Sequence, residues 1–358
     1  MRTMKARMRS KTVAGMAVVA GAFLLVLSVA NGQGTSGQSQ AAPGAFQLEA
    51  PKGLDPVPVP DDNVMTHPKV ELGKRLFFDP RLSLDNSTSC ASCHDPKTGW
   101  SDGQPVSDGV KGKTGTRNAP TVMNAAYNYF QFWDGRSPSL EDQAMHPILN
   151  PVEMAMPSMD EVVAKLKKVP GYQEEFGKVF PDGITATNLQ KAIAAFERTI
   201  LSGNAPYDHF EAGDKSALSA AALRGKDLFF GKANCAACHS GPSFTDGGFH
   251  NTGVGMDRDN PDVGRETVTH LLGDRGSFKT PTLRDIARTA PYMHDGSLAT
   301  LEDVINLYDK GGIINDQLDE EMFPLNLTAE EKKDLITFLK EGLASDNYPY
   351  VEVPTLPQ

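Results

Sequence analysis

All four cysteines of the chain stand in two copies of the pattern Cys-x-x-Cys-His, formed by Cys90, Cys93 and His94 and by Cys235, Cys238 and His239. Two thiols three residues apart can form thioether bonds with the two vinyl groups of one haem. The histidine that follows then lies under the ring, where its imidazole can bind the iron. The pattern therefore predicts two covalently attached c-type haems, with His94 and His239 as axial iron ligands.

Other cysteine chemistries explain this pattern less well. Disulfides are usual in exported proteins, but here every cysteine falls in the repeated motif. Two Cys-x-x-Cys pairs could bind one zinc ion, but zinc does not require a histidine directly after both pairs. A thioredoxin-like dithiol needs a single such motif in a β-α-β context. Haem attachment accounts for all four cysteines and both histidines.

The two motifs lie in two halves of the chain that repeat each other. A Pro-Thr pair, an Asp-Gly pair and a Leu-Glu-Asp triplet follow each motif, 14 residues from Pro to Asp and 6 from Asp to Leu in both halves. The anchors are Pro120, Asp134 and Leu140 in the first half and Pro281, Asp295 and Leu301 in the second. This spacing predicts two related haem domains over residues 61–210 and 211–345, followed by a tail over residues 346–358.

The local signals are mostly helical. Ser158-x-x-Glu161 and Thr328-x-x-Glu331 have the form of capping boxes, and residues 187–201 have apolar side chains at helical spacing. No convincing run of alternating strand residues is present in the sequence. The predicted fold class is therefore mainly α, with haem replacing part of each core.

Residues 1–34 have the pattern of a signal peptide, with a basic start, an apolar stretch over residues 13–30 and small residues after it. The alternative is an uncleaved membrane anchor, because the apolar stretch is close to the ~18 residues at which a span becomes feasible. Either way, the rest of the chain is predicted to lie in the periplasm. Residues 35–60 are rich in Gly, Gln, Ser, Ala and Pro, which predicts a flexible linker.

Without the five basic side chains of residues 1–34, the chain has 30 basic and 45 acidic side chains, a net charge of −15. An acidic surface argues against nucleic acid or an anionic membrane as a partner. It suits a basic protein partner, although acidity also serves solubility.

The repeat indicates what lies on the second side of each iron. Seven residues after the repeated leucine stands Pro147 in the first half and Tyr308 in the second. Proline has no ligand atom in its side chain, whereas tyrosine can bind iron as a phenolate. The first haem is therefore predicted to be open and the second to be six-coordinate. Tyr308 could instead be an ordinary half-buried tyrosine, and the competing ligands would be Met256, Met293, His250 and Met322.

A polar set accompanies the predicted open haem. Gln143 lies one helical turn before Pro147, so both face the same way, and Glu153 follows a turn at Asn150-Pro151. A carboxyl group near an open iron can take a proton from bound peroxide and return one to the leaving oxygen. Taken alone, Glu153 would be read as a surface residue in a loop. Trp133 is the third member of this set.

The two haem motifs, Phe132-Trp133-Asp134-Gly135-Arg136, the stretch from Gln143 to Glu153 and the stretch from Pro281 to Gly296 resemble the bacterial dihaem cytochrome c peroxidase family, which includes MauG. The resemblance covers roughly residues 60–345. It implies two cytochrome c-like domains with their haems facing a shared interface, a peroxidatic haem in the first domain and an electron-transfer haem in the second.

The resemblance also implies roles for individual residues. Glu153 would be the catalytic acid and base with Gln143 beside it, and Trp133 would pass electrons or holes between the haems. His94 and His239 would be the proximal ligands. A calcium ion would be held by the side chain of Asn118 and by the carbonyls of Thr289 and Pro291, oxygen ligands of the sort that calcium takes.

Two departures from the typical family pattern change the expected chemistry. Typical members place a distal histidine in the loop after the first motif, but no histidine lies between His94 and His146, and Val110 stands near that place. Typical members also use methionine on the second haem, 14 residues after the histidine that matches His294, where this chain has Tyr308. The tyrosine resembles MauG, which oxidises tryptophans on a precursor protein.

Three functions compete at this level. In the first, hydrogen peroxide reacts at the first haem, oxidising equivalents pass through Trp133 to the second haem, and a small cytochrome or cupredoxin supplies electrons. In the second, the reductant is a side chain of a partner protein, as for MauG. In the third, the chain is a non-enzymatic dihaem electron carrier. An open iron beside a carboxyl group argues against the third.

Overall fold

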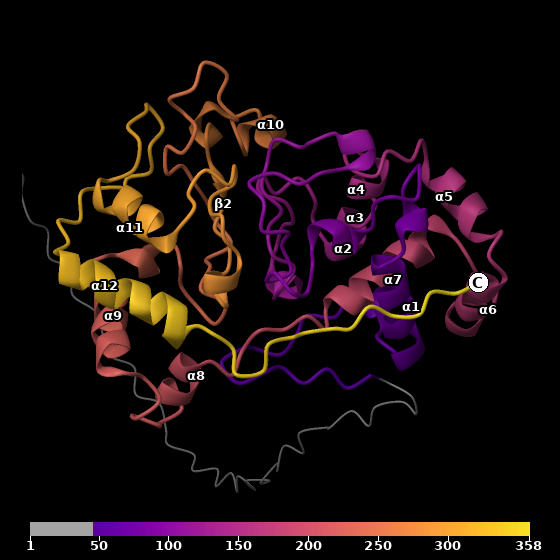
Figure 1. Ribbon diagram of the computed structural model, residues 1–358, viewed down its shortest axis with the longest axis horizontal. Helices are drawn as coiled ribbons and strands as arrows, with labels where there is room; N and C mark the ends of the chain where they lie inside the picture. Colours follow the sequence, from indigo (N-terminus) through magenta and orange to yellow (C-terminus); the bar gives the residue numbers. More distant parts are fainter. Residues whose placement is uncertain (1–45) are drawn as a thin grey trace, which may run out of the picture. The chain divides into compact units, whose positions relative to one another are not determined.

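The computed structural model describes residues 46–358 (Figure 1). The predicted signal peptide, residues 1–34, and the predicted linker as far as residue 45 lie outside the described residues. Within the described part, no helix combines the length and the apolar character that crossing a membrane requires.

Two hydrophobic cores organise residues 46–358. One is built from residues between Met65 and Ile200, and the other from residues between Phe229 and Leu343. We call the regions around them the first and the second lobe. Each lobe contains one Cys-x-x-Cys-His motif, and in Figure 1 the first lobe runs from indigo through magenta to rose and the second from rose through orange to yellow.

Helices form most of the regular structure. The first lobe contains α1 (His67–Phe77), α2 (Cys90–Cys93), α3 (Leu140–Gln143), α4 (His146–Leu149), α5 (Met159–Leu166), α6 (Pro170–Val179) and α7 (Ala186–Glu197). The second contains α8 (Pro206–Glu211), α9 (Ala220–Phe230), α10 (Glu266–Thr269), α11 (Leu301–Asp309) and α12 (Ala329–Thr337). Short helical turns are η1 (Asp61–Asn63), η2 (Pro80–Leu82), η3 (Val110–Gly112), η4 (Ala125–Tyr127), η5 (Cys235–Ala237), η6 (Leu272–Asp274), η7 (Ile286–Arg288) and η8 (Phe338–Gly342).

The sheet of the described residues is small. Strands β1 (Phe249–His250) and β2 (Phe278–Lys279) pair antiparallel, with Phe249 opposite Lys279. The predicted mainly α fold is thereby confirmed.

The repeat in the sequence is also a repeat in the structure. Helix α1 packs against α7 in the first lobe as α9 packs against α12 in the second. At each crossing a glycine lets the two backbones touch. A Cβ atom on Gly73 would lie 1.8 Å from the carbonyl oxygen of Ala192, and one on Gly225 would lie 2.0 Å from that of Asp334. Any larger residue would push the paired helices apart.

Helix α7 is shorter than the apolar spacing over residues 187–201 predicts, because it ends at Glu197. It begins where the Thr185 hydroxyl accepts a hydrogen bond from the N–H of Asn188 at 3.1 Å. Beyond its end, the N–H groups of Thr199 and Ile200 bond to carbonyls three residues back. These bonds tighten the last turn, so the chain leaves the helix although apolar residues continue.

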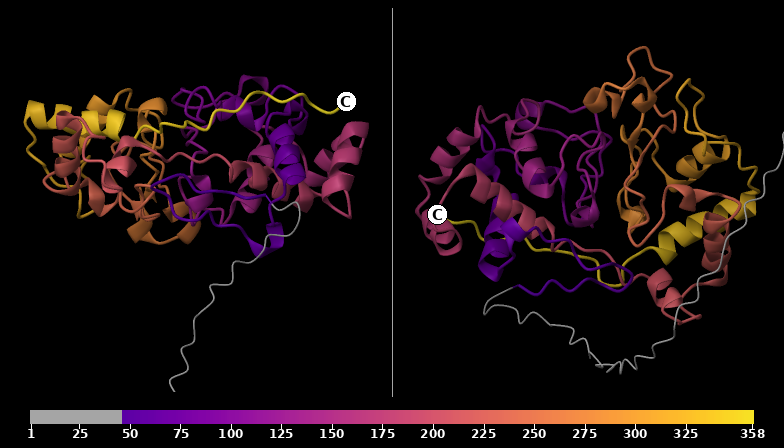
Figure 2. Two further views of the ribbon diagram at one scale, coloured as in Figure 1. Left: turned by 90° about the horizontal axis from the view of Figure 1, so that it is seen from below. Right: turned by 180° about the vertical axis from the view of Figure 1, so that it is seen from behind.

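Two extended segments join the lobes. Residues 46–60 contact both of them, because the Tyr127 hydroxyl donates to the Asp55 carbonyl at 2.8 Å and the Arg284 guanidinium donates to the Gly53 carbonyl at 3.1 Å. Residues 343–358 leave the second lobe and run along the first, as Figures 1 and 2 show. The limits of the two predicted domains stay predictions.

Candidate functional site

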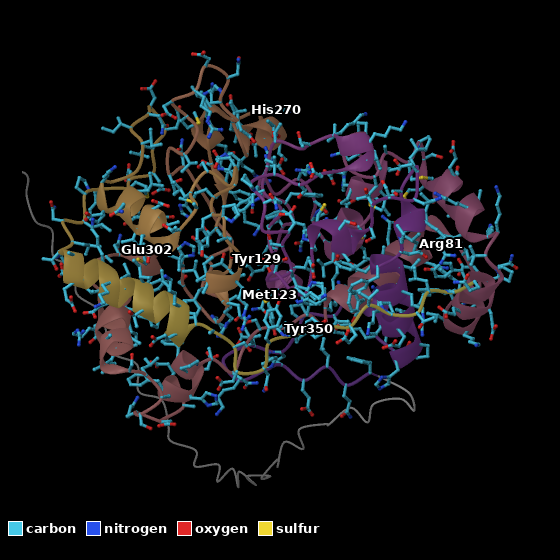
Figure 3. The ribbon with its side chains drawn as sticks, viewed as in Figure 1. Arg81, Met123, Tyr129, His270, Glu302 and Tyr350 are labelled. Atoms are coloured by element: carbon cyan, nitrogen blue, oxygen red, sulfur yellow. The ribbon has the colours of Figure 1, made fainter. Side chains whose placement is uncertain are left out.

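One cavity of about 1200 Å³ connects the two haem-attachment motifs. All six motif residues line it, namely Cys90, Cys93, His94, Cys235, Cys238 and His239. Met123, which Figure 3 labels near the centre of the view, belongs to the same wall. Small-molecule pockets usually measure about 300–1,000 Å³, so this space has room for more than one ordinary ligand.

The two motif histidines are held in the same way. Nδ1 of His94 lies 3.2 Å from the Trp100 carbonyl oxygen, and Nδ1 of His239 lies 3.0 Å from the Phe244 carbonyl oxygen. When Nδ1–H donates to these carbonyls, Nε2 carries the lone pair that can bind iron. Burial lowers the pKa of both imidazoles, which keeps them in the neutral form that a metal requires.

Lys279 supports the fit of haem to this cavity. Its side chain lines the wall, and none of the described residues accepts a hydrogen bond from its Nζ. Burial lowers the pKa of Lys279 to about 8. A buried cation without a partner is costly, and the carboxylates of a haem are the complement that the cavity itself does not supply. No pattern in the sequence indicates this residue, although the repeat pairs it with Asn118.

Tyr308 reaches the cavity from α11. Leu301, Val304 and Ile305 of the same helix also line the wall, as one helical face does. Burial raises the pKa of the Tyr308 phenol, so without a nearby cation this side chain stays protonated. A ferric iron is the kind of cation that would stabilise the phenolate.

Of the four residues that compete with Tyr308 as iron ligand, His250 and Met256 are less available than Met293 and Met322. Both ring nitrogens of His250 are engaged, Nδ1 with Asp319 at 2.6 Å and Nε2 with Asp246 at 2.9 Å. Met256 is not among the residues that line the cavity, whereas Met293 and Met322 line it together with Tyr308.

The first lobe has no ligand atom at the place that matches Tyr308. Pro147 of α4 lines the cavity there. Val110 is buried, and its N–H donates to the Glu153 carbonyl at 2.8 Å. The loop after the first motif is therefore tied to the backbone beside Glu153, and Val110 itself is not among the residues that line the cavity. His146 is not among the residues that line the cavity, and its Nε2 lies 3.2 Å from Asp142.

Gln143 and Glu153 line the cavity with Pro147. The Asn150 amide donates to Oε1 of Glu153 at 2.6 Å, which fixes the carboxyl group. Burial raises the pKa of Glu153, although Arg136 and the bond from Asn150 oppose the shift. A carboxyl group whose pKa is raised toward neutrality can both take and return a proton. Glu153 does lie in a turn, but its side chain is half-buried and lines the cavity instead of the outer surface.

Trp133 lies where the lobes meet. Its indole N–H donates to the Asn118 carbonyl at 2.9 Å, and its own carbonyl accepts from the N–H of Lys279 at 2.7 Å. The indole thus belongs to the first lobe while its backbone is bonded to β2 of the second. The repeat pairs Trp133 with His294, whose carbonyl accepts from the N–H of Asn118 at 2.8 Å.

The three residues predicted to hold calcium, Asn118, Thr289 and Pro291, all line the cavity. The Asn118 amide nitrogen donates to the Gln104 carbonyl at 2.8 Å. This bond leaves Oδ1 of Asn118 as the atom that could bind a cation.

Glu197 is a second cavity residue that no pattern in the sequence indicates. It stands at the end of α7, lines the cavity and is buried, and its Oε2 has no hydrogen-bond partner among residues 46–358. Burial raises the pKa of Glu197 to about 8, so the carboxyl group is mostly protonated at neutral pH. The residue of the second lobe that corresponds to Glu197 is Leu339. Comparison of the two halves therefore gives no sign of a buried acid in the first lobe.

Comparisons with known proteins identify the family of the chain. The pattern of the di-haem cytochrome c peroxidase family matches residues 67–216. The chain is 44% identical to the methylamine utilization protein MauG of Methylorubrum extorquens, over 91% of this chain and 92% of that protein. It is 41% identical to the cytochrome c551 peroxidase of Nitrosomonas europaea, over 80% of this chain and 83% of that protein.

Among solved structures, a MauG-like protein associated with microbial copper homeostasis has a similar fold, with a TM-score of 0.78 at 35% identity over 84% of this chain and 96% of that chain. The resemblance noted in the sequence is confirmed, and with it an oxidoreductase that carries two c-type haems. The chain belongs to the di-haem cytochrome c peroxidase family, which includes MauG.

Proposed function

We propose that this chain reduces hydrogen peroxide in the first lobe, where a bound haem would be open without prior reduction, and that Trp133 would pass the oxidising equivalents toward the haem of the second lobe. One observation carries the proposal: at the place that matches Tyr308, the cavity wall of the first lobe presents Pro147, which cannot bind iron, and the half-buried carboxyl group of Glu153 lies on the same wall. An iron left open next to a proton carrier favours an enzyme over a simple electron carrier.

When bound, the haems would supply the iron at which peroxide reacts and the electrons that its reduction consumes. Reduction of one peroxide to two waters consumes two electrons and two protons. Glu153 is suited to take the proton from one peroxide oxygen and deliver it to the other, while Asn150 holds the carboxyl group in place. Gln143 is placed to hydrogen-bond a polar molecule in the same pocket.

Trp133 is the proposed connection between the two haem sites. Its indole lines the cavity, and its backbone is bonded to β2 of the second lobe. An aromatic ring at this boundary can carry an electron or a hole between the two sites more readily than an aliphatic side chain. The electrons would come from a small cytochrome or cupredoxin, and the net charge of −15 outside residues 1–34 favours a basic one.

A second candidate is the oxidation of side chains on a partner protein, as the relationship to MauG suggests. Tyr308 favours it, since an anionic oxygen ligand stabilises ferric and higher iron relative to methionine. The second haem would then store an oxidising equivalent better than it accepts an electron from a small cytochrome.

Calcium and location complete the proposal. Oδ1 of Asn118 and the carbonyls of Thr289 and Pro291 would hold one calcium ion, and the chain would act in the periplasm after removal of residues 1–34, or attached by them to the membrane.

The experiment for this proposal is stopped-flow mixing of the fully ferric dihaem protein with peroxide and a reduced basic c-type cytochrome. Because Pro147 leaves nothing to displace, we expect cytochrome oxidation from the first turnover, and prior one-electron reduction should not shorten any lag. A lag that disappears after prior reduction would show that a distal ligand closes the first haem. Absence of reaction with both peroxide and cyanide would favour the electron carrier.

A further inference from the structure

The last described segment, residues 343–358, makes a chain of contacts from the second lobe to the first. We call it the C-terminal strap. In the second lobe, the N–H of Asp285 donates to the Leu343 carbonyl at 3.0 Å, and the N–H of Ser345 donates to Oδ1 of Asp285 at 3.2 Å. The strap then crosses to the first lobe, where Figure 3 labels Tyr350 on it and Arg81 near its end. The Arg81 guanidinium donates to the Pro357 carbonyl at 2.9 Å.

Between these ends, the strap is bonded to the loop that holds the proximal histidine of the first haem. The Trp100 indole N–H donates to the Pro349 carbonyl at 3.0 Å, and the Tyr348 hydroxyl donates to the Pro96 carbonyl at 2.6 Å. Trp100 is fully buried, and its carbonyl faces Nδ1 of His94 at 3.2 Å. Two hydrogen bonds thus hold the strap to residues 96 and 100. These residues begin and end the turn whose last carbonyl, that of Trp100, faces the His94 imidazole.

Within residues 46–358, the second lobe has no matching hydrogen bond between its proximal loop and the strap. There the carbonyl that faces His239 belongs to Phe244, which has the same left-handed backbone as Trp100, with φ of 53° against 57°. Phenylalanine has no donor that could reach a strap. The two lobes therefore share the hydrogen bond to the proximal histidine, but only the first lobe anchors its carbonyl to a distant segment through an indole.

The strap also touches the part of the second lobe that adjoins the predicted calcium ligands. The Arg288 guanidinium lies 4.5 Å from the centre of the Tyr348 ring, at the end of η7 and next to Thr289. Tyr348 and Val351 pack against the core of the first lobe. One segment therefore links η7 of the second lobe with the proximal loop of the first.

We propose that the C-terminal strap positions the proximal ligand of the first haem, with Trp100 and Tyr348 holding the carbonyl that accepts the hydrogen bond from His94. A firm bond at Nδ1 increases the basicity of the imidazole and strengthens its bond to iron. It also favours the oxidised iron that forms when peroxide is reduced. Trp100 and Tyr348 are positioning residues here, since neither forms part of a distal pocket. The proposal rests on His94 as the proximal ligand in the proposed function.

The test compares Tyr348→Phe, Trp100→Phe and the control Tyr350→Phe in the dihaem protein. Tyr350 lies two residues beyond Tyr348 on the strap and is exposed, so its hydroxyl takes no part in holding the proximal loop. The main readout is the iron–histidine stretching band of the ferrous first haem in resonance Raman spectra. We expect this band to fall in frequency in Tyr348→Phe and in Trp100→Phe. Peroxide turnover should slow by about 10-fold or more, the low end of the effect of losing a residue that supports a metal ligand. The control and the low-spin signal of the second haem should not change.

A purely structural strap would give a different pattern. The strap variants would then melt at lower temperature but keep the iron–histidine band and the peroxide rate of the unmodified protein, and the proposal would be overturned. Tyr348→Phe removes a single oxygen atom, so it decides the matter if Trp100→Phe fails to fold. If the unmodified protein already lacks the band because its first haem is six-coordinate, the proposed function fails instead, and the reduction potential of that haem in the same variants tests the strap.

Discussion

Replacing Glu153 by glutamine is expected to slow peroxide turnover by about 10²-fold or more while both haems stay attached. Glutamine keeps the size of the side chain and can still bond to Asn150, but it cannot take a proton from peroxide and return it. The measurement is the steady-state rate of peroxide-dependent cytochrome oxidation, with the haem content checked by absorbance. Glu174→Gln, on the exposed face of α6, is the matched control and should leave the rate unchanged.

The same variant tests whether Glu153 determines the pH dependence of peroxide turnover. Burial raises the pKa of Glu153 above its ordinary value of 4.5, and only the ionised form can accept the proton of peroxide. The rate of the unmodified protein should therefore fall as the pH falls through this raised pKa and stay high above it. The step should be missing from the residual activity of Glu153→Gln. Unchanged turnover, or a pH step that survives in the variant, would remove Glu153 from the chemistry.

Replacing Tyr308 by methionine is expected to raise the reduction potential of the second haem by a substantial part of the about 0.8 V range over which axial ligands act. An anionic phenolate stabilises ferric iron, whereas methionine favours ferrous iron. Oxidation of a small cytochrome should survive or improve in the variant, while oxidation of side chains on a partner protein should fail. Spectroelectrochemical titration gives the potential, and the two activities are assayed separately.

Tyr292→Phe is the control for this variant. Tyr292 also lines the cavity, but its hydroxyl already donates to the Ile286 carbonyl at 3.1 Å. Its loss should leave the spectrum of the second haem as it was. An unchanged spectrum in Tyr308→Met itself would show that another residue binds the iron, and Met293 and Met322 are then the candidates on the cavity wall.

Much of the site could be predicted because its residues repeat. The spacing shared by the two halves pairs Pro147 with Tyr308 without any structure, and the structure has both on the wall of one cavity. One helix of each pair also repeats in the sequence, since Gly-Lys-x-Leu-Phe-Phe begins at Gly73 in α1 and at Gly225 in α9.

The residues that sequence reasoning missed are single side chains that differ between the halves. Lys279 takes the place of Asn118, and Glu197 takes the place of Leu339, so comparison of the halves gives no pattern there. Their importance comes from burial, which depends on the folded cavity and not on neighbours in the sequence. The contact between the strap and Trp100 joins residues 249 positions apart, and no local pattern predicts such a pair.

The end of α7 shows a different limit. Apolar spacing continues beyond Glu197, but the N–H groups of Thr199 and Ile200 bond to carbonyls three residues back. Periodicity predicts which face of a helix is buried, whereas its last residue depends on which carbonyls the departing chain can reach.

Low-temperature EPR of the fully ferric dihaem protein tests the central claim most directly. An open first haem and a tyrosine-bound second haem predict one high-spin signal and one low-spin signal with the small anisotropy of His/Tyr ligation, the latter abolished by Tyr308→Phe. Two low-spin signals would contradict the account, because both irons would then be closed, and the chain would be a reductively activated peroxidase or an electron carrier.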